Sequence, residues 1–86
     1  MRIWFKWSID GETGEVVGVY CYDINTVAFH VAEMKGVSEN VAREFVICFI
    51  KFLDRNITLW ELAWLTIWSD VFTELMKTVR IEYVTK

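Results

Sequence analysis

Hydrophobic and polar positions alternate with a period of two in three parts of this chain. Residues 3–9 place Ile3 and every second residue after it on one face, which predicts a half-buried strand. The polar segment 10–15 contains two glycines and predicts a hairpin turn. Residues 15–22 then predict a second strand, and alternation resumes over 80–86 as a third strand.

Helical periodicity fills the chain between the second and third strands. A first helix is expected to begin after Asp23 or Asn25, which are favourable N-caps, and to end at Gly36, since glycine readily adopts the left-handed conformation found there. Ser38 caps a second helix that runs to about Arg55. The two helices are therefore expected to follow one another across a short connection.

The third helical stretch, 57–79, has the clearest start signal. Thr58 and Glu61 have the spacing of a capping box, in which each side chain satisfies a backbone amide at the other end of the first turn. The apolar residues cover about half of the helix circumference, more than the stripe of about 100° that one buried face needs. We therefore expect this helix to pack against both the sheet and the second helix. Its three tryptophans, spaced by four, are expected in the core: Trp60, Trp64 and Trp68.

The order strand, strand, helix, helix, helix, strand predicts an α+β domain. A small antiparallel sheet, made of the N-terminal hairpin and the C-terminal strand, would pack against three helices. Eighty-six residues suit a single domain, 1–86. The longest uncharged run, 62–69, is far shorter than the about 20 residues that span a bilayer, and the N-terminus lacks a signal-peptide pattern. We expect a cytoplasmic protein without a membrane partner.

Composition adds the question of where the apolar surface goes. The chain is 55% hydrophobic and 16% aromatic, and its net charge is -3. Large apolar residues on the solvent side of a small chain indicate a contact surface, because such patches are uncommon on monomers. Patterning places five residues there and predicts a protein-binding surface made of them: Trp4, Tyr20, Tyr22, Phe29 and Ile47.

Residues for catalysis or metal binding are sparse. His30 is the only histidine, and we expect it to be an ordinary helix residue near Glu33. Cys21 and Cys48 are expected to be free thiols, and together with His30 they lack the paired spacing of a zinc site. The acidic turn 10–15 does not fit a calcium loop. No catalytic, metal or cofactor site is therefore expected, and an enzyme acting through His30 is the least favoured function.

The leading hypothesis is a non-catalytic protein that binds and blocks a protein partner as a small inhibitor or adaptor, and that self-associates as a homodimer. Its size and acidity are typical of phage and mobile-element inhibitors, a viral association that rests on composition alone. The alternative is a nucleic-acid-binding domain that uses an aromatic and basic sheet face. Glu82 on that face and the negative net charge disfavour it. Bases would stack on Trp4, Tyr20 and Tyr22, while phosphates would meet Arg2, Lys6, Arg80 and Lys86.

Overall fold

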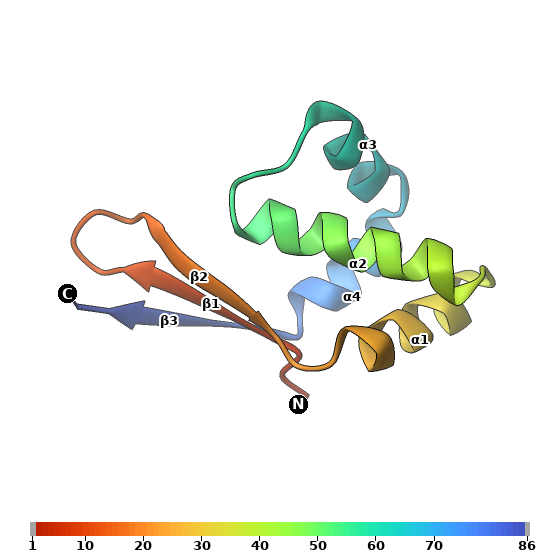
Figure 1. Cartoon of the computed structure of the whole chain (residues 1–86), viewed down its shortest axis with the longest axis horizontal. Coiled ribbons are helices and arrows are strands. Elements are labelled where there is room, and N and C mark those ends of the chain that lie inside the picture. Colours follow the sequence, from red (N-terminus) through yellow and green to blue (C-terminus); the bar gives the residue numbers. More distant parts are fainter. Residues whose placement is uncertain (1, 86) are drawn as a thin grey trace.

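A computed structural model describes residues 2–85 of the chain. It confirms the α+β class and the element order, with four helices instead of three (Figure 1). In chain order the elements are β1 (Phe5–Asp10), β2 (Val16–Cys21), α1 (Ile24–Lys35), α2 (Glu39–Leu53), α3 (Leu59–Ile67), α4 (Ser69–Met76) and β3 (Val79–Val84). The hairpin and β3 extend away from the helices, and the molecule measures 42 × 29 × 18 Å.

The sheet has the order β2-β1-β3 and mixes two strand directions. β1 and β2 form the expected antiparallel hairpin, with Lys6 opposite Tyr20. β3 pairs with β1 in parallel, with Lys6 opposite Arg80, so the prediction of a fully antiparallel sheet is wrong. The reason is the connection: parallel strands need a long crossover, and the four helices return the chain to the end of the sheet where β1 begins.

The predicted 57–79 helix is divided at Trp68. The backbone of Trp68 has φ -95° and ψ 47°, outside the helical region, so α3 ends there and α4 begins in a new direction. α4 enters the core through Val71 and Leu75, whereas Leu65 is the buried side chain of α3. The broad apolar arc expected of one helix is thus split between two helices that bury different amounts of it.

Aromatic packing joins the sheet to the helices. The ring of Phe5 in β1 lies 4.9 Å from that of Phe49 in α2, and both side chains are fully buried. Phe45 of α2 contacts Trp68 at the bend between α3 and α4, with ring centroids 4.9 Å apart. The helices therefore pack against the Phe5 end of β1, on one face of the sheet. On the opposite face Lys6 is exposed, Ser8 is half-buried and Asp10 is buried.

The predicted helix boundaries are confirmed where local chemistry sets them. Asp23 and Ser38 accept hydrogen bonds from backbone amides of the first turns of α1 and α2. Thr58 and Glu61 form the capping box of α3. Gly36 ends α1 with φ 68°, a conformation that is costly for residues with a Cβ atom. Within residues 2–85, each helix is too short or too polar to cross a membrane.

Candidate interaction surfaces

The outer side of α3 is a row of exposed apolar side chains. Trp60 is 88% exposed, Leu59 82% and Ile67 75%. Ala63 lies between them and Leu62 at the edge, and both are also exposed. The spacing of 59, 63 and 67 by four places these residues along one side of the helix. We call this set of five uncharged residues the α3 face.

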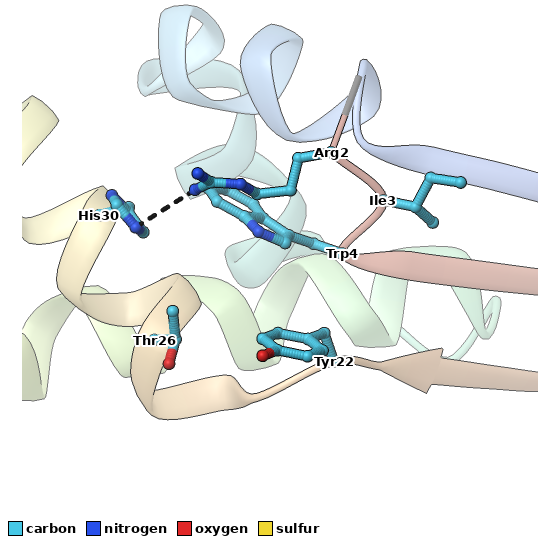
Figure 2. A pocket seen from close by; sticks show the side chains of 6 residues that line it. All are labelled: Arg2, Ile3, Trp4, Tyr22, Thr26 and His30. Carbon is cyan, nitrogen blue, oxygen red and sulfur yellow. Dashed lines mark hydrogen bonds between the residues drawn. The ribbon is translucent and has the colours of Figure 1, made fainter.

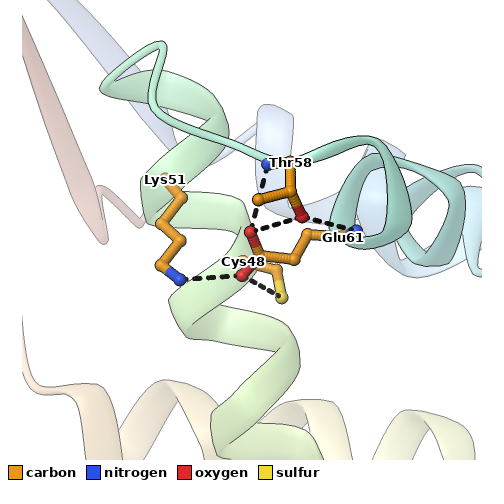
Figure 3. Close-up of polar contacts among 4 residues, drawn as sticks. All are labelled: Cys48, Lys51, Thr58 and Glu61. Carbon is orange, nitrogen blue, oxygen red and sulfur yellow. Dashed lines mark hydrogen bonds and ion pairs between the residues drawn. The ribbon is translucent and has the colours of Figure 1, made fainter.

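An ion pair and a cap hold the first turn of α3 against α2 (Figure 3). Glu61 Oε2 lies 2.8 Å from Lys51 Nζ, and Glu61 Oε1 accepts hydrogen bonds from the amide and hydroxyl of Thr58. The hydrogen bond from Lys51 and, to a smaller extent, those from Thr58 lower the pKa of Glu61 to about 2. Burial and the nearby Glu61 carboxylate raise the pKa of the Cys48 thiol. Glu61, the charged residue of α3, thus faces α2, whereas the five residues of the α3 face point to solvent.

A shallow apolar groove adjoins the α3 face. Its volume is about 240 Å³, and it runs between α3 and α4. Leu62 belongs to both the groove and the α3 face, so the two form one continuous apolar surface. The groove is lined by Leu62, Leu65, Thr66, Ser69 and Phe72.

The residues that patterning assigned to a contact surface divide into two groups. Tyr20, Tyr22 and Phe29 are exposed, as expected. Trp4 is only 8% exposed and Ile47 is half-buried, so the expectation that both lie open to solvent is wrong. Tertiary packing explains Trp4, because α1 lies against that side of the chain. None of the five belongs to the α3 face.

The α3 face was missed because tryptophans spaced by four usually form core. One signal in the sequence could have found it: the apolar arc of 57–79 is wide enough for two partners. The chain supplies one of them, since α2 covers the side of α3 that carries Leu65 and Trp64. Trp60, which was expected in the core, is left without a partner inside the described chain, 2–85.

A second surface lies on the side of the sheet that the helices leave open. Strand pairing places Tyr20, Lys6 and Arg80 in one row across β2, β1 and β3. Lys6 Nζ lies 5.6 Å from the centre of the Tyr20 ring. Tyr22 follows Tyr20 by two residues and therefore points to the same side. We call this surface the open sheet face; its next row holds Gly18, Ser8 and Glu82.

A pocket of about 370 Å³ lies beside Tyr22, where the open sheet face meets α1 (Figure 2). Trp4 stacks on His30 with ring centroids 5.4 Å apart, and the Arg2 guanidinium lies 5.4 Å from the Trp4 ring centre. Arg2 and His30 are in contact, with 3.4 Å between Nη1 and Nε2. The lining residues are Arg2, Ile3, Trp4, Tyr22, Thr26 and His30.

Groups with metal-binding or catalytic chemistry are dispersed over the fold. His30 lies 3.8 Å from Glu33, as patterning suggested, and the two cysteines are free thiols on different elements. In the part of the chain that the structure describes, His, Cys, Asp and Glu side chains form no group of three that could hold a metal ion.

No protein-family model matches this sequence, and no curated protein or solved structure matches it.

Proposed function

We propose that this protein is a non-catalytic binding protein whose α3 face occupies a hydrophobic groove on a protein partner. The observation that carries the proposal is the 88% exposure of Trp60 between two similarly exposed aliphatic residues. A tryptophan side chain buries on the order of 200 Å² in an interface. At about 25 cal/mol per Å² this contributes about 5 kcal/mol before the costs of association. Exposed tryptophan is also the residue type most enriched at binding hot spots.

The α3 face is presented on a fixed helix. The capping box and the pair between Lys51 and Glu61 hold the first turn, and Leu65 anchors the helix to the core. Pre-ordered contact residues lose less conformational entropy on binding, which favours affinity. Anchors along one helix side are the pattern by which amphipathic helices bind hydrophobic grooves. The proposed mode of action is therefore occupation of a partner's groove, as an inhibitor or adaptor would do.

A second copy of the chain is one candidate partner. Two α3 helices packed antiparallel with Ala63 at their crossing would set Leu59 and Trp60 of each copy near Ile67 of the other. Ala63 is small enough to allow close approach there, and the absence of charge on the α3 face avoids repulsion between copies that each carry net -3. The free thiols suit a reducing compartment, so the proposal places the protein in the cytoplasm.

Site-specific crosslinking tests the proposal. A photoreactive amino acid at Thr66, beside the α3 face, should capture a protein in cells that naturally make this chain. The same amino acid at Thr73, exposed on α4, should capture little. Adding Trp60→Ser to the Thr66 probe should abolish capture while the circular dichroism spectrum stays unchanged. The mass of the product separates a second copy from a different protein, and equal capture from positions 66 and 73 would refute the proposed surface.

A further inference from the structure

We infer that the open sheet face and the adjoining pocket form a binding site for single-stranded nucleic acid, separate from the α3 face. In this site Tyr20 and Tyr22 stack on unpaired bases, while Lys6, Arg80 and Arg2 contact phosphates. The site lies on the side of the sheet opposite Phe5. Its strand residues therefore do not pack against the helices.

Strand register brings the required groups together. Lys6 lies directly between Tyr20 and Arg80, and neighbouring strands are about 4.8 Å apart. Tyr20 and Tyr22 are separated along the strand by about 6.7 Å, which leaves room for two successive bases. Tyr20 is 53% exposed and Tyr22 60%, so their rings are accessible. Every base has a π-face, so stacking of this kind is tolerant of sequence.

The row of the sheet next to Tyr20 carries small side chains, so a nucleic-acid strand can lie on it. Gly18 and Ser8 are paired in the next row, and no atom lies within 4 Å of the place where a Cβ of Gly18 would be. A sheet face with small residues beside aromatic ones allows bases to lie flat against it. Duplex nucleic acid does not fit this arrangement, because its bases are stacked on one another and unavailable to the tyrosines.

Charge is distributed favourably on this face even though the whole chain is acidic. Arg2, Lys6 and Arg80 carry three positive charges. Two carboxylates share this face: Glu82, whose Oε1 is 4.0 Å from Arg80 Nε, and Asp10 at the turn, which accepts hydrogen bonds from the amides of Glu12 and Thr13. Asp23 follows Tyr22, and its carboxylate accepts hydrogen bonds from two amides of the first turn of α1. Phosphates that approach the row formed by Tyr20, Lys6 and Arg80 therefore meet two cations side by side, although the whole chain is acidic.

The pocket suits one nucleotide at the end of the path. Its volume of about 370 Å³ falls within the range of small-molecule sites, about 300–1,000 Å³. Tyr22 offers a ring for stacking, and Figure 2 shows it facing the pocket opposite Thr26 and His30. Arg2 lies at one side, where its Nη1 is 3.4 Å from His30 Nε2 and the remaining N–H groups of the guanidinium can donate hydrogen bonds to a phosphate.

Fluorescence anisotropy with labelled dT12 and U12 oligonucleotides tests this inference on the full chain. Binding at 20 mM salt should weaken steeply at 200 mM, because phosphate contacts release counterions (about 0.7 of a log unit per contact per log unit of salt). Tyr20→Ala and Tyr22→Ala should each raise Kd by about tenfold, and the effect should be the same for both oligonucleotides. Tyr83→Ala is the matched control, because Tyr83 is 73% exposed on the other face of the same sheet.

Charge variants test the phosphate contacts separately. Lys6→Gln and Arg80→Gln should each weaken binding. Each should also reduce the slope of log affinity against log salt concentration by the amount that one phosphate contact contributes. Lys77→Gln removes an exposed charge that is paired with Glu74 at the end of α4, and it should change neither. Trp60→Ser should also leave oligonucleotide binding intact, which keeps this test independent of the proposed protein partner. Thermal unfolding of each variant verifies that the fold is retained.

Three results would overturn the inference. The first is the absence of an anisotropy change at 20 mM salt with the protein in large excess over the oligonucleotide. The second is an equal loss of affinity in Tyr83→Ala and Tyr20→Ala, which would mean that the open sheet face is not the site. The third is equal competition by UMP and by U12, because a strand held along the sheet must bind more tightly than one nucleotide in the pocket.

Discussion

Glu61 of α3 and Lys51 of α2 form an ion pair with 2.8 Å between Oε2 and Nζ. The pair joins the first turn of the helix that carries Trp60 to the helix that forms the centre of the core. The carboxylate is also part of the capping box with Thr58. A single side chain thus caps α3 and attaches it to α2.

This relationship predicts how stability responds to acid. The folded state lowers the pKa of Glu61 from 4.5 to about 2, so its stabilising contribution is complete above about pH 4.5 and is lost as pH falls toward 2. Urea midpoints measured at pH 6, 4 and 3 should fall less steeply for Glu61→Gln than for the wild type. Lys35 also lowers the pKa of Asp70, so the urea midpoint of Glu61→Gln should still fall somewhat as the pH is lowered. Glu74→Gln, on the exposed side of α4, is the control, and identical slopes for Glu61→Gln and the wild type would contradict the prediction.

Trp60 and Leu65 lie on opposite sides of α3 and should respond differently to substitution. Trp60→Ser removes an exposed side chain and should change the free energy of unfolding by less than about 0.5 kcal/mol. Leu65→Ala leaves a cavity in the core and should cost about 2–5 kcal/mol. Chemical denaturation measures both. A large loss of stability in Trp60→Ser would mean that the indole packs inside the molecule and is not available to a partner.

Self-association through α3 predicts a sensitive position at Ala63. A charge at the crossing of two copies would be buried beside its own symmetry mate, so Ala63→Glu should shift a dimer to monomer. Light scattering across a range of concentrations measures the mass. Thr73→Glu introduces the same charge at an exposed position of α4 and should leave the mass unchanged. A wild-type chain that stays monomeric at millimolar concentration would limit the α3 face to a different protein.

Trp4 is predicted to be a packing residue. It is buried between Arg2 and His30, so Trp4→Ala should cost about 3–5 kcal/mol of stability. Phe29→Ala, at a side chain 47% exposed on α1, should cost far less. Thermal unfolding of the two variants side by side gives the comparison. Equal destabilisation would show that exposure is a poor guide to packing at this junction of sheet and helix.

Local chemistry made the caps and turns predictable. Asp23, Ser38, Thr58 and Gly36 act on amides or carbonyls within a few residues, so their effect can be read directly from the sequence. The first hairpin follows from alternation and a glycine-containing turn in the same way. These features fix where most elements begin and end.

Tertiary choices were not encoded locally. The helical period continues smoothly through Trp68, and the bend arises where its ring packs on Phe45. Alternation predicts β3 but does not say which strand it joins or in which direction. The alternation of residues 3–9 places Trp4 on the side of the strand that was predicted to face solvent. Trp4 is buried because His30 of α1 stacks on its ring. The α3 face was missed for a related reason, since the pattern of the sequence does not show that α2 covers only the side of α3 that carries Leu65 and Trp64.

The parallel pairing of β1 with β3 has a consequence for folding. Phe5 cannot meet Val79 until nearly the whole chain is available, so the sheet is completed by the least local contact in the molecule. During synthesis the hairpin and the first helices can form early, while one edge of β1 keeps unpaired backbone groups and remains open to other chains. Docking of β3 closes that edge. Truncation before residue 79 should therefore cause aggregation of a partly folded chain. The full-length chain would depend on chaperones during synthesis until β3 has been made.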